Sequence, residues 1–294
     1  MAPDNAAGAG TGLGDFVVEA TLGSGGSATV YLAQDTAEGR RVALKVLGEQ
    51  HRGAADRERL RREYRLAARV THPHIVDVYR LGPHWLTMQY VDGGNAATLP
   101  ARGDRLTALA QIADALDHAH RMGIVHCDVK PANILVFRDF AACGAMLIDF
   151  GVAHAVAEDM ARRLGTDLSG PAHFSLDPAR RITHERAPRP VQVVASLPYV
   201  APELLVGRVP SAATDEYGLA CAAVELLTGA PPFAGTDASH LVDAQIHEPP
   251  PRISERTELP RAVDAVVATA LAKNPEERYE SCRAFVDALT RALR

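Results

Sequence analysis

Two acids, a lysine and an asparagine stand in a fixed order within the segments HCDVKPANIL and MLIDFG of residues 126–151. Asp128 is placed to accept the proton of an incoming hydroxyl group, while Lys130 offers a cation to a phosphate. Asn133 and Asp149 supply oxygen ligands of the kind that Mg²⁺ prefers. Transfer of the terminal phosphoryl group of ATP requires mainly positioning and the neutralisation of negative charge. The order of these residues therefore predicts a phosphoryl-transfer site.

Two short apolar runs must bring the two metal ligands together. Residues 134–137 follow Asn133 directly, and residues 145–148 lead directly into Asp149. Both runs are predicted as short strands, separated by a hairpin-like break. Such strands would bring Asn133 and Asp149 to one edge, where the cation would bind.

These residues resemble the catalytic motifs of the eukaryotic-like (Hanks-type) protein kinases, and within that family the bacterial Ser/Thr branch. The motifs stand in this chain as His126, Asp128 and Asn133, then Asp149, Phe150 and Gly151, and finally Ala201, Pro202 and Glu203. The resemblance covers about residues 14–292. Lys130 favours a Ser/Thr kinase, because the catalytic loop of Tyr kinases usually lacks a lysine at this position.

The resemblance implies an α+β protein with the bilobal protein-kinase-like fold. A small β-rich N-lobe with one main helix is expected at about residues 14–91, a hinge at about 89–94, and a larger, mostly helical C-lobe at about 95–292. Residues 1–13 are small and rich in glycine and alanine, so we expect a flexible tail there.

A glycine-rich segment follows the first expected strand of the upper lobe. In GSGGSATV, Gly23 and Gly25 come before Val30 at the spacing of a kinase glycine-rich loop. Glycines let backbone N–H groups close over phosphates without interference from a Cβ atom. Such a loop alone is weak support, since many hairpins are glycine-rich. Ala28 occupies the position of the third glycine, which could shift the affinity for nucleotide without removing it.

A strand is predicted at residues 40–47, RRVALKVL, at the distance after the glycine-rich segment that a kinase requires. Its period of two puts Ala43, Lys45 and Leu47 on one face. The resemblance implies that Ala43 covers the adenine while Lys45 reaches the phosphates.

A charged helix is predicted at residues 54–70, and Glu63 interrupts its apolar stripe instead of lying on the charged face. The stripe consists of Leu60, Ala67 and Val70. The resemblance supplies Lys45 as the partner of this carboxylate, in an ion pair that orients ATP and must form for activity. The alternative is a solvated surface glutamate paired with Arg59 or Arg62.

The remaining nucleotide contacts follow from the resemblance. The segment TMQYVDGG is similar to the hinge that binds adenine through backbone groups of Gln89 and Val91, and Met88 then takes the gatekeeper position. Met88 would also be an ordinary core residue. The complete set expected to bind the nucleotide is Leu22, Gly23, Gly25, Val30, Ala43, Lys45, Met88, Gln89, Val91 and Leu135. The implied cofactors are ATP and Mg²⁺, with Mn²⁺ as an alternative cation.

The second half of the chain predicts a helical lobe. Residues 106–122 have helical spacing, and residues 212–229 are apolar nearly all round, which is typical of a buried helix. Further helices are expected near 235–247, 260–272 and 281–292. By resemblance, Asp215 bonds back to the catalytic loop, and Arg278 forms a buried ion pair with Glu203. A surface arginine is the alternative.

One position departs from the kinase pattern. Cys127 stands where most of these kinases have an arginine that receives a phosphate from the activation loop. We therefore expect activity that does not depend on loop phosphorylation. The long segment at residues 152–200 offers the hydroxyls of Thr166, Ser169, Ser175 and Thr183. Ser196 matches the position of a family threonine that touches the catalytic aspartate.

Composition limits the other functions. A net charge of −5 gives no basic footprint for a nucleic acid or an anionic membrane. No apolar run approaches the ~20 residues of a membrane span. The four cysteines are far apart and lack metal-ligand spacing, so free thiols and a cytoplasmic location are expected. A metal site at His118, His120 and His126 is not expected, because two of them share a helix without a third ligand at workable spacing.

The leading interpretation is an ATP-dependent Ser/Thr protein kinase that transfers the γ-phosphoryl group of ATP to protein hydroxyls, its own included. The expected partners are protein substrates, and a homodimer through the upper lobe is left open. Two alternatives are a nucleotide-binding pseudokinase and a small-molecule kinase of the antibiotic phosphotransferase type. The filled catalytic positions count against the first, while Ser196, Arg278 and the segment 201–203 count against the second.

Overall fold

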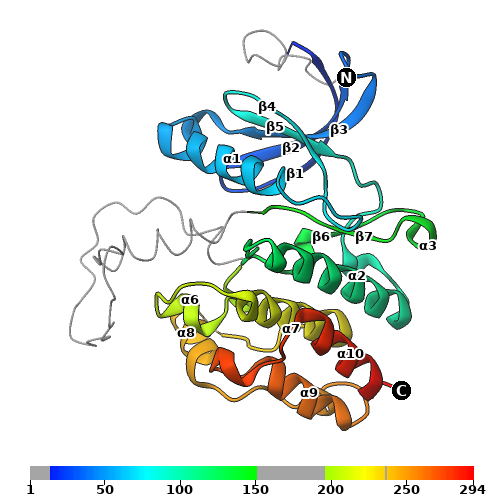
Figure 1. The fold of residues 1–294 in the computed structure, drawn as a ribbon, viewed down its shortest axis with the longest axis vertical. Helices are drawn as coiled ribbons and strands as arrows, with labels where there is room; N and C mark the ends of the chain where they lie inside the picture. The colour runs from blue at the N-terminus through cyan, green and yellow to red at the C-terminus, as the bar shows by residue number, and fades with distance from the viewer. Residues whose placement is uncertain (1–13, 151–195, 236) are drawn as a thin grey trace, which may run out of the picture.

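The computed structural model describes residues 14–150, 196–235 and 237–294, and it has two lobes, one above the other in Figure 1. The upper lobe is a five-stranded antiparallel sheet with the strand order β1-β2-β3-β5-β4. Its strands are β1 (Phe16–Ser24), β2 (Ala28–Asp35), β3 (Arg40–Leu47), β4 (Val78–Leu81) and β5 (Trp85–Gln89). Helix α1 (Ala54–Ala67) packs against β4 and β5. The predicted bilobal fold is confirmed.

The buried face of α1 is the predicted one. Leu60, Glu63 and Ala67 are buried, and Val70 is buried just beyond the helix. The helix ends at Ala67 instead of residue 70, and Pro73 follows closely, which disfavours helical backbone at the residue before it.

Strand β4 begins at Val78, because the backbone before it pairs with the other lobe. The N–H of Leu147 donates to the carbonyl of His74 at 2.8 Å, and the N–H of Val76 donates to the carbonyl of Leu147 at 3.0 Å. These bonds join the two lobes behind the cleft.

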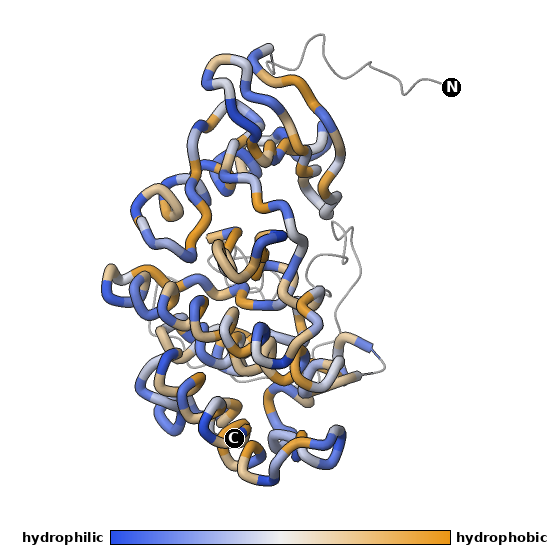
Figure 2. The backbone as a smooth tube through the Cα atoms, turned by 90° about the vertical axis from the view of Figure 1, so that its right-hand side faces the viewer, coloured by the Kyte–Doolittle hydropathy of each residue, from blue (hydrophilic) through white to orange (hydrophobic). Residues whose placement is uncertain are grey.

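The lower lobe is built around α7 (Ala212–Thr228), which is buried on nearly every side, as predicted. Helices α2 (Arg102–Arg121) and α10 (Cys282–Ala292) pack on it and on each other, and α9 (Ala262–Ala270) contacts α7 and α10. Helix α8 (Ala238–His247) follows a side-chain cap from Asp237. Figure 2 shows hydrophobic and hydrophilic residues in turn along the lower-lobe helices, as expected where one face of each is buried.

Several short elements were not predicted. They are α3 (Phe140–Cys143), α6 (Pro202–Leu205) and the 3₁₀ turns η1 (Glu49–His51), η2 (Ala96–Thr98), η3 (Pro131–Asn133), η4 (Leu197–Tyr199), η5 (Ile253–Glu255) and η6 (Pro275–Glu277). Elements of three or four residues are too short for a hydrophobic period to reveal.

A two-stranded hairpin lies at the boundary of the lobes. Strands β6 (Ile134–Val136) and β7 (Ala145–Leu147) pair antiparallel, as the two apolar runs predicted. The break between them contains α3, which Asp139 caps by accepting the N–H of Ala142. Gly144 then turns the chain back with a φ of 72°.

The segment between the lobes lies directly against β6. The N–H of Gly93 donates to the carbonyl of Val136 at 3.0 Å, and the N–H of Val136 donates to the carbonyl of Gly94 at 2.9 Å. A Cβ atom at Gly93 would lie 2.5 Å from the Val136 oxygen and 2.5 Å from the Phe137 carbonyl carbon. Only glycine fits this position.

Candidate active site

The catalytic loop is tied to the segment that carries Asp149. The backbone N–H of Asp128 donates to His126 Nδ1 at 3.2 Å, so the proton of this buried imidazole is on Nε2. The Nε2–H group of His126 donates to the carbonyl of Ile148 at 2.8 Å. The ring of Phe150 packs edge-on against the imidazole, with centroids 4.7 Å apart. His126 therefore holds the loop and the residue before Asp149 together.

Asp215 of α7 fixes the backbone of the loop from below. Its carboxylate accepts the N–H of His126 at 2.8 Å and the N–H of Cys127. Cys127 has a φ of 63°, a left-handed conformation that costs a non-glycine residue free energy. The predicted bond from Asp215 is confirmed, and it stabilises this conformation. His120 Nε2, 2.7 Å from the same carboxylate, is a partner that the sequence did not predict.

The predicted base, Asp128, is buried and held by two donors. Its Oδ2 accepts from Lys130 Nζ at 2.7 Å and from Asn133 Nδ2 at 2.9 Å. Among the described residues, none donates to Asp128 Oδ1. Lys130 Nζ also donates to Ser196 Oγ at 2.8 Å, so Ser196 reaches the aspartate through the lysine.

The predicted metal ligands meet at one end of the β6–β7 hairpin. The N–H of Ile148 donates to the carbonyl of Asn133 at 3.1 Å, which brings Asp149 next to Asn133. The amide nitrogen of Asn133 is used by Asp128, so its oxygen is left as an acceptor. A carboxylate and an amide oxygen are hard ligands that fit Mg²⁺ or Mn²⁺.

Lys45 lies between two carboxylates. Its Nζ is 2.7 Å from Glu63 Oε1 and 2.9 Å from Asp149 Oδ1. The alternative of a solvated surface glutamate is wrong, because Glu63 is buried and Arg59 pairs with Asp56 instead. The contact between Lys45 and Asp149 was not predicted.

One ammonium shared by two acids shifts all three pKa values. Burial alone would lower the pKa of Lys45, but Asp149 and Glu63 outweigh it and hold this pKa well above its usual value. Burial opposes ionisation of Asp149 too, yet the attraction of Lys45 keeps the pKa of Asp149 below its usual value. Burial, together with repulsion from Asp149, raises the pKa of Glu63 to about 7 against the opposing pull of Lys45. Of the two carboxylic acids, Glu63 therefore has the higher pKa.

Five of the residues predicted to bind the nucleotide lie in one apolar cluster below the sheet. Its buried and half-buried members include Val30, Ala43, Met88, Val91 and Leu135. The cluster joins strands of the upper lobe to the β6–β7 hairpin, so it has the composition expected for an adenine site between the lobes.

The hinge and glycine-loop residues differ in what they can offer. The N–H of Gln89 is bonded to the carbonyl of Asp77, whereas that of Val91 has no hydrogen bond within the part of the chain that the structure describes. Leu22 is exposed, and Gly23 pairs with Val30 near the β1–β2 turn. The N–H of Gly25 closes that turn on the carbonyl of Ala28 at 2.8 Å.

A buried ion pair anchors the lower lobe. Arg278 Nη1 and Nη2 donate to Glu203 Oε1 and Oε2 at 2.9 and 2.8 Å, and both side chains are buried. The guanidinium also donates to the carbonyls of Ala213 and Ala272. The predicted pair is confirmed, and the surface-arginine alternative is wrong.

Some predictions fall on residues that the structure does not describe. These are the flexible tail at 1–13, Gly151, and the hydroxyls of Thr166, Ser169, Ser175 and Thr183.

All four cysteines are free thiols. Burial, with the acids Asp215, Glu203 and Asp128 nearby, raises the pKa of the Cys127 thiol far above its usual value, so this side chain is neutral. Among the helices of the described residues, none has the length and hydropathy to cross a membrane.

Known proteins resemble this chain in sequence and in fold. The profile of the protein kinase domain matches residues 16–289. The serine/threonine-protein kinase PknJ of Mycobacterium tuberculosis is 39% identical over 97% of this chain, and PknH of the same organism is 35% identical over 92%. The chain spans 46% of PknJ and 41% of PknH. The crystal structure of the M. tuberculosis PknI kinase domain is 31% identical, with a TM-score of 0.65 over 95% of both chains. This chain therefore belongs to the protein kinase family.

Proposed function

We propose that this chain is an active serine/threonine protein kinase that transfers the γ-phosphoryl group of ATP to hydroxyl groups of proteins, including its own. The single observation that carries this proposal is the setting of Asp128. Its Oδ2 is held by two donors, Lys130 and Asn133, while Oδ1 has no donor among the described residues. A carboxylate oriented in this way is ready to accept the proton of a serine or threonine hydroxyl.

The other catalytic residues have separate tasks in this proposal. Lys130, between Asp128 and Ser196, offers its ammonium to the phosphoryl group in transfer. Lys45, which Glu63 orients at 2.7 Å, binds the phosphates of ATP from the upper lobe. Both lysines supply positive charge where negative charge must be held.

The nucleotide and its cation are assigned to the cleft. Val30, Ala43, Met88 and Leu135 enclose the adenine, and the N–H of Val91 donates to it. Leu22, Gly23, Gly25 and the carbonyl of Gln89 complete the set. Asn133 and Asp149 would hold Mg²⁺ or Mn²⁺, and the bound cation would neutralise the charge of the phosphates.

Three further parts of the proposal concern the substrate and the location of the chain, the boundaries of its lobes, and its oligomeric state. Protein kinases act on protein substrates, and a cytoplasmic location agrees with the four free thiols. We also propose the lobe boundaries given above, with the hinge at about residues 89–94.

A homodimer through the upper lobe has exposed apolar residues available on the edge strand β1, at Val17 and Val18. Sedimentation over a range of protein concentrations tests the dimer.

The test of the activity is phosphoryl transfer from labelled ATP and Mg²⁺, with the chain alone and with a generic basic protein. Asp128→Asn should lower the rate by roughly 10²- to 10⁴-fold, because the base is lost. Lys45→Met should also abolish labelling. The matched control is Asp139→Asn, which changes the cap of α3 and should keep the wild-type rate.

Mass spectrometry then identifies the labelled residues. Phosphoserine and phosphothreonine that vanish in both catalytic variants support the proposal. Nucleotide binding without any turnover of the wild-type chain would contradict it and favour a pseudokinase. Labelling of a small amine or sugar, with proteins left unlabelled, would favour a small-molecule kinase.

A further inference from the structure

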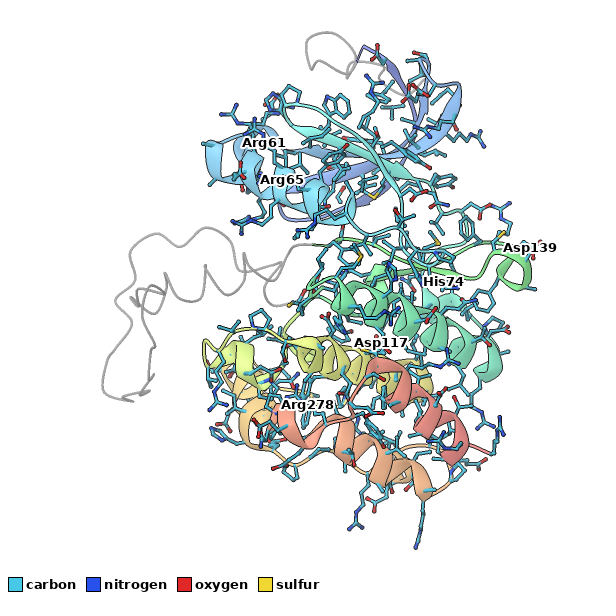
Figure 3. The ribbon with its side chains drawn as sticks, in the orientation of Figure 1. Arg61, Arg65, His74, Asp117, Asp139 and Arg278 are labelled. Carbon is cyan, nitrogen blue, oxygen red and sulfur yellow. The ribbon has the colours of Figure 1, made fainter. Side chains whose placement is uncertain are left out.

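Three side chains of metal-ligating types meet on the lower lobe, away from the nucleotide cleft. Asp117 and His120 lie one turn apart on α2, and Cys282 is the first residue of α10. One ligand atom from each lies within 4.8 Å of the other two. Figure 3 labels Asp117, which lies on α2 among the helices of the lower lobe. Cys282 and Asp117 are 165 residues apart in the sequence, so no spacing pattern could reveal the group.

The orientation of His120 is fixed by a second carboxylate. Its Nε2 is 2.7 Å from Asp215 Oδ2, an atom that also accepts the backbone N–H of His126. A carboxylate only accepts, so Nε2 carries a proton, and in the neutral imidazole Nδ1 offers a lone pair. This Nδ1 is 3.8 Å from Asp117 Oδ1, a distance too long for a hydrogen bond.

Two lone-pair atoms near one another repel, and a cation between them removes that repulsion. A histidine whose other nitrogen donates to a carboxylate is also the usual arrangement of a metal-bound imidazole. The contact with Asp215 thus fixes the ring of His120 in the way that a metal-bound imidazole is usually fixed.

The surroundings of Cys282 are negative. Its side chain is buried in the same group as the carboxylate of Asp117, which also accepts the backbone N–H of Cys282. A divalent cation is the species that such a site stabilises, because it displaces the thiol proton and balances the carboxylates.

Asp117 is already held in place by the helix that it caps. Its two carboxylate oxygens accept the N–H groups of Cys282 and Arg283, each at 3.0 Å. A carboxylate oxygen has more than one lone pair, so capping leaves electrons for a metal. Helix α10 and the aspartate thus position each other before any ion binds.

We propose that Asp117, His120 and Cys282 form a Zn²⁺ site, with water as the fourth ligand. One oxygen, one nitrogen and one thiolate sulfur are the ligand types that Zn²⁺ accepts, while Mg²⁺ prefers oxygen alone. Bonds of about 2.0–2.3 Å around a tetrahedral ion place ligand atoms roughly 3.3–3.8 Å apart, so the side chains close on the ion by about 1 Å. Binding releases the thiol proton of Cys282 to solvent.

The ion would connect distant parts of the lower lobe. It would bond α2 to α10, and through His120 and Asp215 it would be linked to the backbone of His126 and Cys127. The site is thus structural, and its occupancy stabilises the platform beneath the catalytic loop. It does not depend on the proposed kinase activity.

The test uses the whole chain, freed of metal with a chelator and then titrated with Co²⁺ as a coloured substitute for Zn²⁺. We expect one Co²⁺ per chain, with a thiolate-to-cobalt absorption band in the near ultraviolet that Zn²⁺ abolishes. Cys282→Ser should lose the band. Cys143→Ser, which removes an exposed thiol, and Cys221→Ser, which removes a buried one, should keep it.

Two further measurements keep the proposal open to refutation if Cys282→Ser folds poorly. Asp117→Asn keeps an acceptor for the helix cap and should weaken Zn²⁺ binding at least tenfold. Zn²⁺ at about 100 times its dissociation constant should raise the wild-type Tm by roughly 5 °C. The absence of a cobalt–thiolate band, its survival in Cys282→Ser, or its loss in Cys143→Ser would each overturn the proposal.

Discussion

Two of the buried charge clusters among the described residues differ in how completely their charges are matched. In the lower lobe, Glu203 and Arg278 form two parallel hydrogen bonds, and their side chains are 3% and 0% exposed. In the cleft, Lys45 serves both Glu63 and Asp149, and the three side chains remain 16%, 11% and 26% exposed. One cluster has a cation for each acid, and the other has one cation for two acids.

This difference separates a structural pair from a site that can exchange partners. Glu203 also accepts the hydroxyl of Thr214, so every change at this pair disturbs several bonds. Asp149 shares its cation with Glu63 and can therefore give up that contact when another positive charge approaches. The first arrangement suits a structural role, and the second suits the proposed binding of a metal-bound nucleotide.

The largest expected effect comes from removing the cation of the structural pair. Arg278→Ala leaves Glu203 buried without its counter-charge, which should lower the free energy of unfolding by about 3–5 kcal/mol. Lys45→Met, the matched loss of a cation in the cleft, should cost roughly 1–2 kcal/mol, because Asp149 reaches solvent and Glu63 can take up a proton. Urea denaturation of both variants measures this. A larger loss in Lys45→Met than in Arg278→Ala would contradict the comparison.

A smaller effect is expected at Glu216, a buried acid without a cation of its own. Its Oε1 accepts the N–H of Tyr279 at 3.0 Å, and among the described residues its Oε2 has no partner. Burial raises the pKa of Glu216 to about 8 from an ordinary 4.5. Since the folded-state pKa lies above the unfolded one, this group adds stability below about pH 4.5, and that stability is lost as the pH rises through about 8.

Glu216→Gln removes this titration and keeps the shape of the side chain. The unfolding free energy of the variant relative to wild type should therefore rise by roughly 2–4 kcal/mol between pH 5 and pH 9. Denaturation at a series of pH values measures the difference between the two proteins. A difference that stays constant with pH would show that Glu216 does not titrate in this range.

The smallest expected effect concerns the hydroxyls between the motif at residues 149–151 and the motif at residues 201–203. Cys127 is a neutral side chain where a kinase with an arginine would bind a loop phosphate, and its N–H is committed to Asp215. Replacing Thr166, Ser169, Ser175 and Thr183 together with alanine should therefore leave most of the peptide-kinase activity. Rates measured on a peptide substrate test this, and a hundredfold loss would be incompatible with it.

Much of the site could be predicted from the sequence because its motifs fix both residue type and spacing. The pairing of Lys45 with Glu63, the bond from Asp215 to the catalytic loop and the Glu203–Arg278 pair are all as expected. The β6–β7 hairpin was visible in two apolar runs.

What could not be predicted depends on side chains whose partners are distant or exchangeable. The contact of Lys45 with Asp149 is not encoded in the spacing of either motif. His120 could have been noticed as a histidine on the last turn of a helix, but nothing in the sequence pointed to Asp215 as its partner. The start of strand β4 could not be predicted either, because Ile75, just before it, pairs with Leu147 of β7 in the other lobe.

Gly93 limits how the lobes can move. The N–H of Gly93 and the carbonyl of Gly94 both bond to Val136 of β6. Gly93 lies so close to the Val136 carbonyl that it has no room for a side chain. The lower lobe therefore holds one end of the connection immobile, and the backbone can swivel only in the few residues before Gly93. Any separation of the lobes would then have to bend the chain before Gly93 and would also strain the second link between the lobes, the bonds of Leu147 with His74 and Val76.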